Sequence, residues 1–354
     1  TMKSFLPKPC YQTFFGLVLS AGFASADITV SSDPVGYYRI PLTEGYQTVG
    51  VSLVNSPEFV TLVGSSSFFT ISSTETTVDV GALLDPALTY YVEVVDGPNT
   101  ISDPHVGHRF EVDVASTVDA GTPDGDVMID LSAFTNTTAP VPDLTGYRVE
   151  LRKHITLGEA FDKDQLFGSL QLSSSDQVQF FDGTSFKPYY LLAQSNDPGA
   201  VKIWGEFDFT NADEVIIPPG VGVVFKRSSQ ATGDADVIVT GKVRTNPFYQ
   251  ALNPGFNFVA EPFPVSSSFT DRDAFPTDFT PNFAASQADQ VQVLEGGSFT
   301  TYYLAGTVSA NAWVLINDLS TSQNETEVFD YRHPVFFKMI NPIGNYRVPL
   351  LWTP

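Results

Sequence analysis

One block of sequence occurs twice in the chain, and this repetition limits the possible folds more than any other feature. Asp-Gln-Val-Gln, followed at fixed spacings by Gly, Ser-Phe and Tyr-Tyr-Leu, begins at Asp176 and again 113 residues later at Asp289. A tryptophan follows each block, at Trp204 and Trp313, and then a segment ending in Val-Phe-Lys or Phe-Phe-Lys. Identities kept in register over this distance predict two copies of one structural unit.

Shorter matches extend the repetition toward both ends. A Gly-aromatic pair precedes a double tyrosine by 45, 43 and 47 residues, starting at Gly45, Gly146 and Gly255. The segments Gly36–Leu42 and Gly344–Leu350 are also similar. We therefore predict a signal peptide over residues 1–26, a degenerate β repeat over 27–132, a second over 133–244, and a third with an extra closing strand over 245–354.

The composition indicates an all-β protein. Serine, threonine, valine, phenylalanine and tyrosine dominate, and turn pairs such as Asp33-Pro34, Asp96-Gly97 and Asp182-Gly183 recur along the chain. We expect tandem β-sandwich or barrel-like repeats with very little helix. The best short-helix candidates are Gly158–Leu172 and Asn282–Gln290.

The first residues are typical of an export signal. Lys3 and Lys8 precede an apolar run over Phe14–Phe23 and then Ala24-Ser25-Ala26, so the mature chain is expected to begin at Asp27. The sequence therefore predicts a secreted protein, extracellular or on the surface of a bacterium. Cys10 is the one cysteine, so the mature chain is expected to lack disulfides and thiolate metal sites.

Charge limits the possible partners. The full chain carries a net charge of −22, and loss of residues 1–26 leaves 16 basic against 40 acidic side chains. Such a surface repels nucleic acid and anionic membranes. No other stretch approaches the roughly 20 apolar residues of a membrane helix, so we expect no membrane insertion.

Four features carry a resemblance to known sequences. They are the leader, Asp-Pro-Val-Gly at Asp33–Gly36, the Gly255–Pro264 segment, and Ala-Asp-Gln-Val-Gln at Ala288–Gln292. In these residues the chain resembles an uncharacterised family of exported β-rich repeat proteins of verrucomicrobial-type bacteria. The resemblance covers most of the mature chain and implies structural rather than catalytic motifs. Members often end in a sorting tail, and its absence here implies release or non-covalent attachment.

Two groups of residues are candidates for a metal. His105 and His108 lie near Asp103, but on a strand the two imidazoles would face opposite sides, so a polar loop is the favoured interpretation. Asp124, Asp126 and Asp130, with Asp119, gather oxygen ligands of the kind that calcium prefers, without its usual twelve-residue pattern. A hairpin turn is favoured there, and structural calcium is the alternative.

No catalytic motif stands out. The 40 acidic residues offer too many carboxylate pairs for any one to indicate glycoside hydrolysis. We find no Gly-x-Ser-x-Gly elbow, phosphate-binding loop or dinucleotide fingerprint, so we expect neither an enzyme nor a cofactor.

The aromatic residues of the repeat have two interpretations. Tyr190, Trp204, Tyr303 and Trp313 could form a platform on which sugar rings stack. Adjacent tyrosines on a strand point to opposite faces, so one of each pair is expected in the core. Core packing is the favoured interpretation for the set.

The leading functional hypothesis is a non-enzymatic structural protein that self-assembles head to tail through its terminal strands. Those strands carry Tyr37, Tyr38 and Ile40 at one end and Tyr346, Val348 and Leu350 at the other. Pro41 and Pro349 could instead blunt the edges of a monomer. The alternatives are an extracellular protein that binds polysaccharide and, less favoured, a secreted hydrolase.

Overall fold

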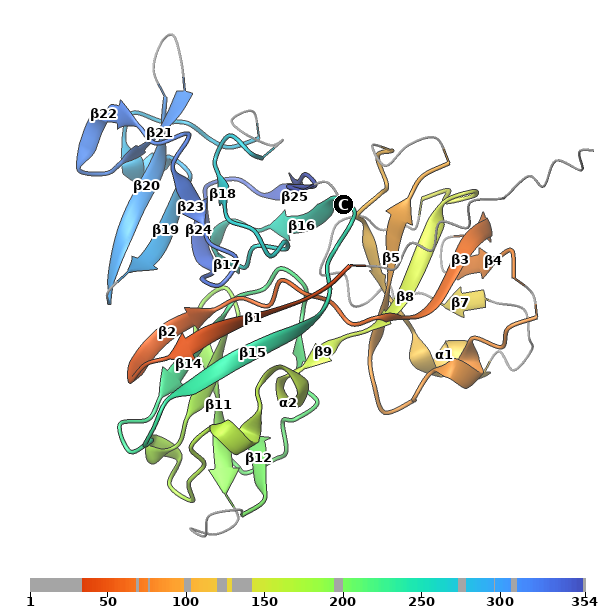
Figure 1. Ribbon diagram of the computed structural model, residues 1–354. Helices are drawn as coiled ribbons and strands as arrows, with labels where there is room; N and C mark the ends of the chain where they lie inside the picture. Colours follow the sequence, from red (N-terminus) through yellow and green to blue (C-terminus); the bar gives the residue numbers. More distant parts are fainter. Residues whose placement is uncertain are drawn as a thin grey trace, which may run out of the picture. The chain divides into compact units, whose positions relative to one another are not determined.

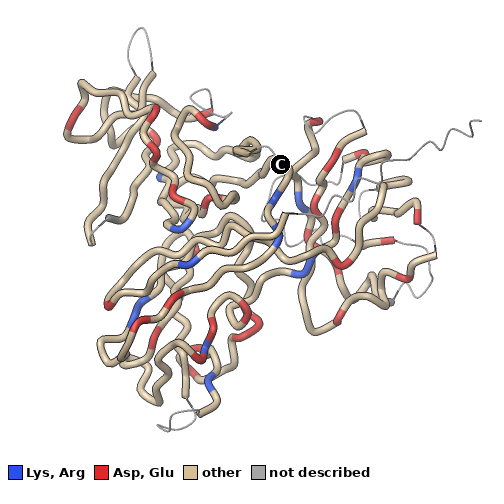
Figure 2. Tube along the Cα trace, viewed as in Figure 1, with Lys and Arg blue, Asp and Glu red and all other residues tan. Residues whose placement is uncertain are grey.

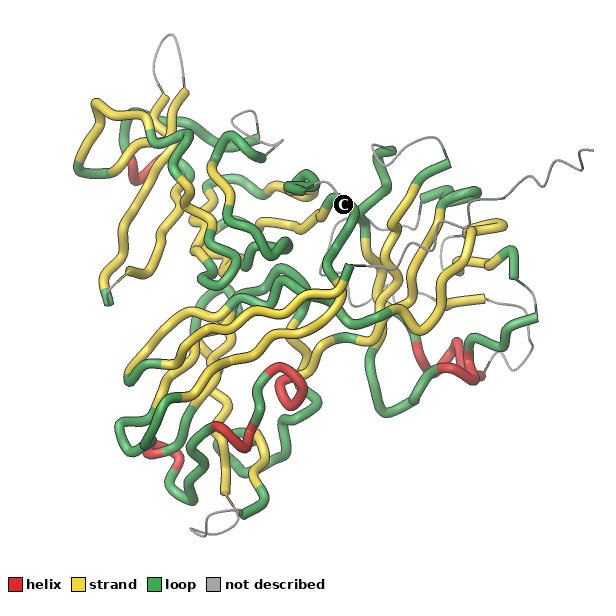
Figure 3. The backbone as a smooth tube through the Cα atoms, viewed as in Figure 1, coloured by secondary structure: helices red, strands yellow, loops and turns green. Residues whose placement is uncertain are grey.

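The computed structural model describes residues 34–67, 70–75, 77–98, 103–119, 126–128, 142–193, 200–272, 278–295, 297–306 and 311–352. Strands dominate these residues and the helices are few and short (Figure 3). The all-β prediction is confirmed. The predicted signal peptide, residues 1–26, lies outside the described part of the chain.

The middle unit is built from the two strands nearest the start of the described chain together with residues 155–243. Its main sheet has the order β12-β11-β10-β14-β2, while β1 pairs with β15 and β9 with β13 (Figure 1). Trp204 and Phe225 are fully buried in its core. The strands are β1 (Val35–Leu42), β2 (Gly45–Val49), β9 (Ile155–Thr156), β10 (Gln177–Phe181), β11 (Phe186–Ala193), β12 (Lys202–Gly205), β13 (Ile216–Ile217), β14 (Val223–Arg227) and β15 (Ala235–Lys242).

The C-terminal unit repeats this arrangement and adds one strand. Its main sheet has the order β17-β24-β19-β20-β21-β22, while β16 pairs with β25 and β18 with β23. Trp313 and Leu304 are fully buried in its core. The strands are β16 (Phe248–Leu252), β17 (Gly255–Val259), β18 (Ser267–Ser268), β19 (Gln290–Glu295), β20 (Ser298–Gly306), β21 (Asn311–Leu315), β22 (Asp318–Ser322), β23 (Glu327–Phe329), β24 (Val335–Met339) and β25 (Ile343–Val348).

The two main sheets agree in register as well as in strand order. Gln177 lies opposite Tyr190 in the middle unit, and Gln290 lies opposite Tyr303 in the C-terminal unit. The strand that opens each copy of the block, β10 or β19, is also directly preceded by a 3-10 turn, η3 (Leu172–Ser174) or η4 (Ala285–Gln287). The block that recurs after 113 residues therefore occupies the same place in both units.

The remaining strands form an inserted unit with a different topology. Its sheet has the order β6-β5-β8-β3-β4-β7, and its own core includes Val92, Phe110 and Leu151. It interrupts the middle unit between β2 and β9. The elements are β3 (Pro57–Ser66), β4 (Thr70–Ser73), η1 (Gly81–Leu83), β5 (Tyr90–Asp96), β6 (Arg109–Glu111), α1 (Val114–Asp119), β7 (Asp126–Met128) and β8 (Arg148–Lys153).

The sheets thus divide the chain differently from the predicted repeats over residues 27–132 and 133–244. β2, which begins at Gly45, pairs with β14 rather than with strands near Tyr90. Gly146 leads into β8 of the inserted unit instead of opening the middle unit. The predicted division between residues 244 and 245 falls in the connection from β15 to β16.

Equivalent strands can be identified from their local hydrogen bonds. The Gln47 side chain accepts from Thr43 N–H at 2.9 Å and donates to the Pro41 carbonyl at 3.1 Å. The Asn257 side chain likewise accepts from Asn253 N–H at 2.8 Å, but it donates to the carbonyl of Asn253 itself, at 2.7 Å. β1 therefore corresponds to β16, and β15 to β25. Gly36–Leu42 and Gly344–Leu350 therefore lie on strands that take opposite places in the two ribbons, β1 with β15 and β16 with β25, and they look alike because both alternate inward and outward residues.

Both helix candidates contain only short turns. α2 (Leu157–Ala160) begins with a capping box, in which Thr156 Oγ1 accepts from Glu159 N–H, and η2 (Lys163–Gln165) and η3 follow. Asn282–Gln290 contains η4 alone. Among the described residues, no helix is both long and apolar enough to cross a bilayer.

The closing strand is part of the C-terminal core, which leads to a first prediction. Truncation after Asn341 removes Tyr346 and Val348, whose side chains are 0% and 1% exposed. We expect this unit to unfold, because loss of even one large buried side chain costs about 3–5 kcal/mol. Tryptophan emission should shift to longer wavelength. Asn345→Ala, an exposed position on the same strand, should leave the emission unchanged, and an unshifted truncated chain would contradict the placement of β25.

Candidate interaction surfaces

The terminal strands are integral to their own units. Tyr38 and Ile40 of β1 and Tyr346 and Val348 of β25 are at most 8% exposed, and Leu350 packs against the C-terminal core beyond β25. Of the residues predicted to mediate assembly, Tyr37 alone is strongly exposed, at 74%. Four of the six residues assigned to assembly strands are therefore buried in their own units, and assembly through these strands stays a prediction.

The backbone of β1 nevertheless has an open side. Val243 N–H donates to the Pro34 carbonyl at 2.8 Å, which makes the even-numbered residues of β1 the ones that exchange hydrogen bonds with β15. The backbone groups of Val35, Tyr37 and Arg39 therefore point away from β15. Within the described residues β1 pairs with no strand other than β15.

The equivalent side of β16 is covered by the inserted unit. Arg109 Nη2 donates to the Tyr249 carbonyl at 2.9 Å, and Tyr249 corresponds to Arg39 of β1. Gly107, at φ +99°, approaches so closely that an added Cβ would lie 2.3 Å from the Pro247 carbonyl oxygen. The edge of β16 is therefore in contact with the inserted unit, whereas no described strand pairs with the equivalent edge of β1.

Buried charged residues join the inserted unit to the connection between β15 and β16. Glu93 and Glu150, on neighbouring strands of the inserted sheet, are 0% and 5% exposed. Arg244 pairs with Glu93, and Lys242 Nζ donates to Glu150 at 3.1 Å. Arg152 lies against both carboxylates. Figure 2 shows Lys and Arg positions gathered where the end of β15 passes β5 and β8. We call these five residues the ionic joint.

Aromatic and amide groups extend the ionic joint to the C-terminal unit. The Arg109 guanidinium lies 4.0 Å from the centre of the Phe248 ring, with Arg244 at 4.9 Å from that centre. Asn246 Nδ2 donates to Glu93 at 3.0 Å. Burial lowers the pKa of Arg109 to about 10, which still leaves it charged at neutral pH. All three units therefore meet at one buried set of charges.

A second prediction concerns the ionic joint. Glu93→Gln leaves Arg244 and Arg152 without the Glu93 charge in a buried site, so we expect the free energy of unfolding to fall by about 3–5 kcal/mol. Urea unfolding measures this difference. Glu58→Gln, at an exposed position on β3, should change it by less than about 0.5 kcal/mol. Equal small effects of the two substitutions would show that the joint does not stabilise the fold.

A buried aspartate repeats in the middle and C-terminal units with different partners. Asp176 accepts from Phe167 and Ser228 N–H at 2.8 and 2.7 Å, and Asp289 accepts from Thr280 and Ile340 N–H at 2.7 and 2.6 Å. Asp176 also pairs with Arg227 at 2.5 Å. Met339 takes the place of Arg227 in the C-terminal unit, and burial there raises the pKa of Asp289.

This difference yields a third prediction. Arg227→Met gives Asp176 the surroundings of Asp289, and we expect a loss of about 3 kcal/mol of stability at neutral pH. Met339→Leu is the matched control and should cost less than about 1.5 kcal/mol. Urea unfolding at neutral pH measures both differences, and an equally small loss for the two substitutions would contradict the charge argument.

The predicted glycan platform is mostly core. Trp204 and Trp313 are fully buried and Tyr303 is 3% exposed, because each lies on the inward or covered face of its sheet. Tyr190 is half-buried. The favoured interpretation, core packing, therefore holds for the two tryptophans and Tyr303, and the platform alternative does not.

The structure describes only part of the predicted metal sites. Asp126 begins β7, while Asp124 and Asp130 lie outside the described part, so calcium stays a prediction. The described residues contain no group of three His, Cys, Asp or Glu side chains suited to a metal. His105 and His108 pack as rings with centres 5.7 Å apart.

The burial of His108 makes the free energy of unfolding depend on pH. Burial lowers its pKa to about 4 from an ordinary value of 6.5, and His105 and Arg109 add to this effect. The unfolded state therefore binds more protons between these two pH values. The free energy of unfolding therefore falls as the pH is lowered from 6.5 through 4, because protonation of His108 favours the unfolded state.

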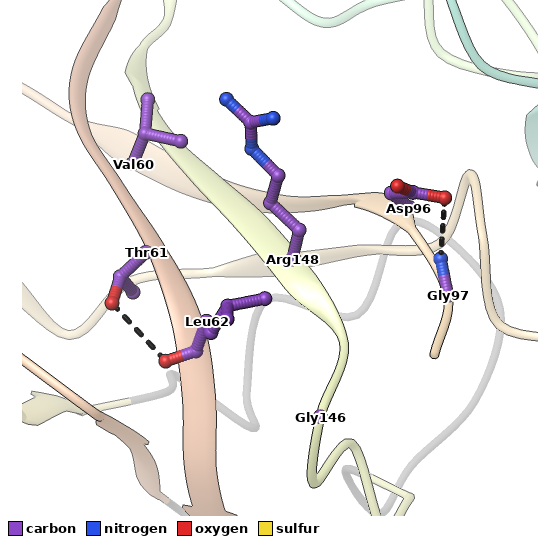
Figure 4. A pocket seen from close by; sticks show the side chains of 7 residues that line it. All are labelled: Val60, Thr61, Leu62, Asp96, Gly97, Gly146 and Arg148. Atoms are coloured by element: carbon purple, nitrogen blue, oxygen red, sulfur yellow. Dashed lines mark hydrogen bonds between the residues drawn. The ribbon is translucent and has the colours of Figure 1, made fainter. Parts of the chain in front are cut away.

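Two concavities are open to solvent. One, of about 440 Å³, lies on the inserted sheet, where Val60 and Leu62 of β3 face Arg148 of β8 and Asp96 ends β5 (Figure 4). Val60 and Leu62 are 37% and 52% exposed. None of its lining residues is among the buried polar groups without a partner, so it gives no indication of a specific ligand.

The other concavity is a groove of about 600 Å³ along the seam between the middle and C-terminal units. It lies between the β10–β11 turn and the strands β16 and β17. Phe181, Phe256 and Phe258 supply aromatic surface, and Thr184, Gln250 and Asn253 supply polar side chains. Sequence reasoning missed this groove, although Gly255–Pro264 had stood out as a motif.

The seam itself is nearly symmetric. Gly50 N–H donates to the Arg332 carbonyl, and the equivalent Ala260 N–H donates to the Gly220 carbonyl, both at 2.9 Å. Phe181 of the middle unit contacts Phe336 of the C-terminal unit across the seam, with ring centres 5.6 Å apart. Each unit uses the same surface to contact the other, as in a two-fold symmetric dimer. Both copies of this surface are therefore occupied, and neither is free to bind a third unit.

The comparisons with known proteins return no match. No family model, no curated protein and no solved structure matches the chain. The resemblance to exported β-rich repeat proteins therefore stays a prediction.

Proposed function

We propose that this is an exported, non-enzymatic structural protein of the bacterial surface or surroundings, and that it self-associates through the open side of β1. The observation that carries the proposal is the difference between two equivalent strands. The side of β16 is occupied by Arg109 and Gly107, whereas Val35 and Tyr37 on β1 are 77% and 74% exposed. An uncovered strand edge with exposed apolar side chains is a ready site for pairing with another chain.

The simplest assembly pairs β1 with β1 of a second copy across a two-fold axis. β25 belongs to the C-terminal core, which disfavours the head-to-tail exchange expected from sequence. The reciprocal seam likewise disfavours open stacking of units. Pro41 limits the length of the new pairing, since it has no N–H and its carbonyl accepts from Gln47. The usable edge is therefore short, from Val35 to Arg39.

The use of charged groups supports a structural rather than a catalytic role. Glu93, Glu150 and Arg152 form buried ion pairs in the ionic joint, where the units meet. Glu261 and Arg272 pair inside the C-terminal core, where Arg272 also donates to Tyr346 Oη at 2.5 Å. These groups face packed protein rather than either concavity, so they support rigidity.

A fourth prediction tests the assembly. Tyr37→Lys places a charge on the edge without touching the pairs with β15, so we expect an unchanged melting temperature and loss of association. Leu170→Lys, at a 55% exposed position outside β1, should associate like the unchanged chain. Sedimentation velocity over a range of concentrations measures both.

Two results would contradict this proposal. One is an unchanged chain that stays monomeric at the highest concentration at which it is soluble. The other is a Tyr37→Lys chain that associates as strongly as the unchanged chain and the Leu170→Lys control.

A further inference from the structure

We infer that residues 105–109 of the inserted unit form an autoinhibitory cover on the edge of β16, and that acid removes this cover. The inference rests on the proposed function in one respect, because it assigns to β16 the same pairing between two copies that we propose for β1. With the cover in place, only one of these two equivalent edges is open, and copies join as a pair. With the cover removed both edges are open, and copies join in a longer row.

The edge of β16 has the same capacity for pairing as the edge of β1. Tyr249 takes the place of Arg39, so its backbone groups point away from β25 just as those of Arg39 point away from β15. Arg109 Nη2 donates to the Tyr249 carbonyl at 2.9 Å, and an added strand would donate to that same carbonyl. Gly107 packs against the Pro247 carbonyl just before β16. Removal of the cover therefore frees a strand edge without any change within β16.

An imidazole ring holds the cover against β16. His108 is 5% exposed, and its ring packs edge-on against the Tyr249 ring with centres 4.6 Å apart. Its Nδ1 atom is buried and has no hydrogen-bond partner within the described part of the chain. A protonated ring has donors on both nitrogens, so the Nδ1 donor would lack an acceptor in a site that disfavours charge. The ring therefore takes up a proton more readily when the cover leaves β16.

The groups around His108 do not offset a positive charge on its ring. Glu93 pairs with Arg244, and the Asp103 carboxylate lies against Gly97. The titratable and charged groups on the elements packed here are Asp103, His105 and Arg109 on its own segment, Glu93 on β5, Tyr249 on β16 and Arg347 on β25.

The pKa of His108 determines how strongly acid acts on the cover. Burial, followed by the charges of His105 and Arg109, lowers this pKa to about 4. With 4 in the covered state and the ordinary 6.5 in the open state, the ratio of open to covered chains rises about 20-fold from about pH 7 to about pH 5. The open state binds more protons in this range, so acid opens the cover and neutral pH closes it.

A fixed charge tests the cover at neutral pH. His108→Lys carries a positive charge there, so we expect sedimentation velocity on the full chain to show assemblies larger than the pair formed by the unchanged chain. Pro104→Lys adds the same charge at an exposed position beside the cover and should sediment like the unchanged chain. Hydrogen exchange of β5 and β8 should stay slow in both variants, which shows that the inserted unit remains folded.

A second variant tests the role of acid without adding a charge. His108→Phe keeps a ring against Tyr249 and cannot take up a proton, while every carboxylate of the chain is unchanged. At about pH 5 we expect the unchanged chain to form the larger assemblies and the His108→Phe chain to sediment as it does at neutral pH. Equal behaviour of these two chains would overturn the role of His108, and this comparison decides the question if His108→Lys does not fold.

Combination with Tyr37→Lys separates this inference from the proposed function. The Tyr37→Lys chain should be monomeric at neutral pH, whereas a chain with both Tyr37→Lys and His108→Lys should pair through β16 alone. A double variant that stays monomeric, with β5 and β8 still slow to exchange, would overturn the inference and leave the proposal for β1 standing. An unchanged chain that is monomeric while the His108→Lys chain pairs would contradict the proposal for β1 and support the cover.

Discussion

The buried pairing of Glu93 and Glu150 with Arg152, Lys242 and Arg244 is the interaction on which the rest of the structure depends. Two carboxylates removed from water are strongly unfavourable unless cations and hydrogen bonds surround them. Arg152 is on the inserted sheet itself, and the other two cations, Lys242 and Arg244, come from the chain that leaves the middle unit and enters the C-terminal unit. The inserted unit therefore holds that connection in one place, and the connection sets where β16 begins. A chain with so few basic residues places three of them at this one joint.

The reciprocal seam works together with the ionic joint. Gly50 and Ala260 make equivalent hydrogen bonds in opposite directions, so the middle and C-terminal units face each other through corresponding surfaces. The inserted unit breaks this symmetry, because it covers the edge of β16, whereas no described strand pairs with the same edge of β1. One asymmetric insertion in a nearly symmetric pair thus accounts for the difference between the two edges, on which the proposed assembly rests.

Much of the fold could be predicted from sequence, and the failures have physical reasons. The 113-residue repeat and the turn-rich composition are local signals, and they indicated the related sheets and the all-β class. Similar Gly-aromatic pairs at Gly45 and Gly146 could not reveal that one strand pairs with β14 and the other lies in an insertion, because strand pairing is non-local. Gly36–Leu42 and Gly344–Leu350 look alike because both strands alternate inward and outward residues.

The candidate sites were harder to predict than the fold. Trp204 and Trp313 were correctly favoured as core residues, but nothing local marked Gln250 as a buried amide in a groove, since its neighbours there come from Pro218 and Val221. The ionic joint likewise joins Glu93 to Arg244 across a long sequence separation. Such contacts become visible only when the three units are placed against one another.

Hydrogen exchange at β1, followed as a function of protein concentration, tests the central claim most directly. The claim is that the insertion leaves one edge of an otherwise rigid body open for association. We expect the Tyr38 amide, which pairs with β15, to be protected at all concentrations, and the Tyr37 amide to exchange quickly when dilute and to become protected when concentrated. Fast exchange at Tyr37 at every concentration, or protection of Tyr37 in the dilute monomer, would contradict the account.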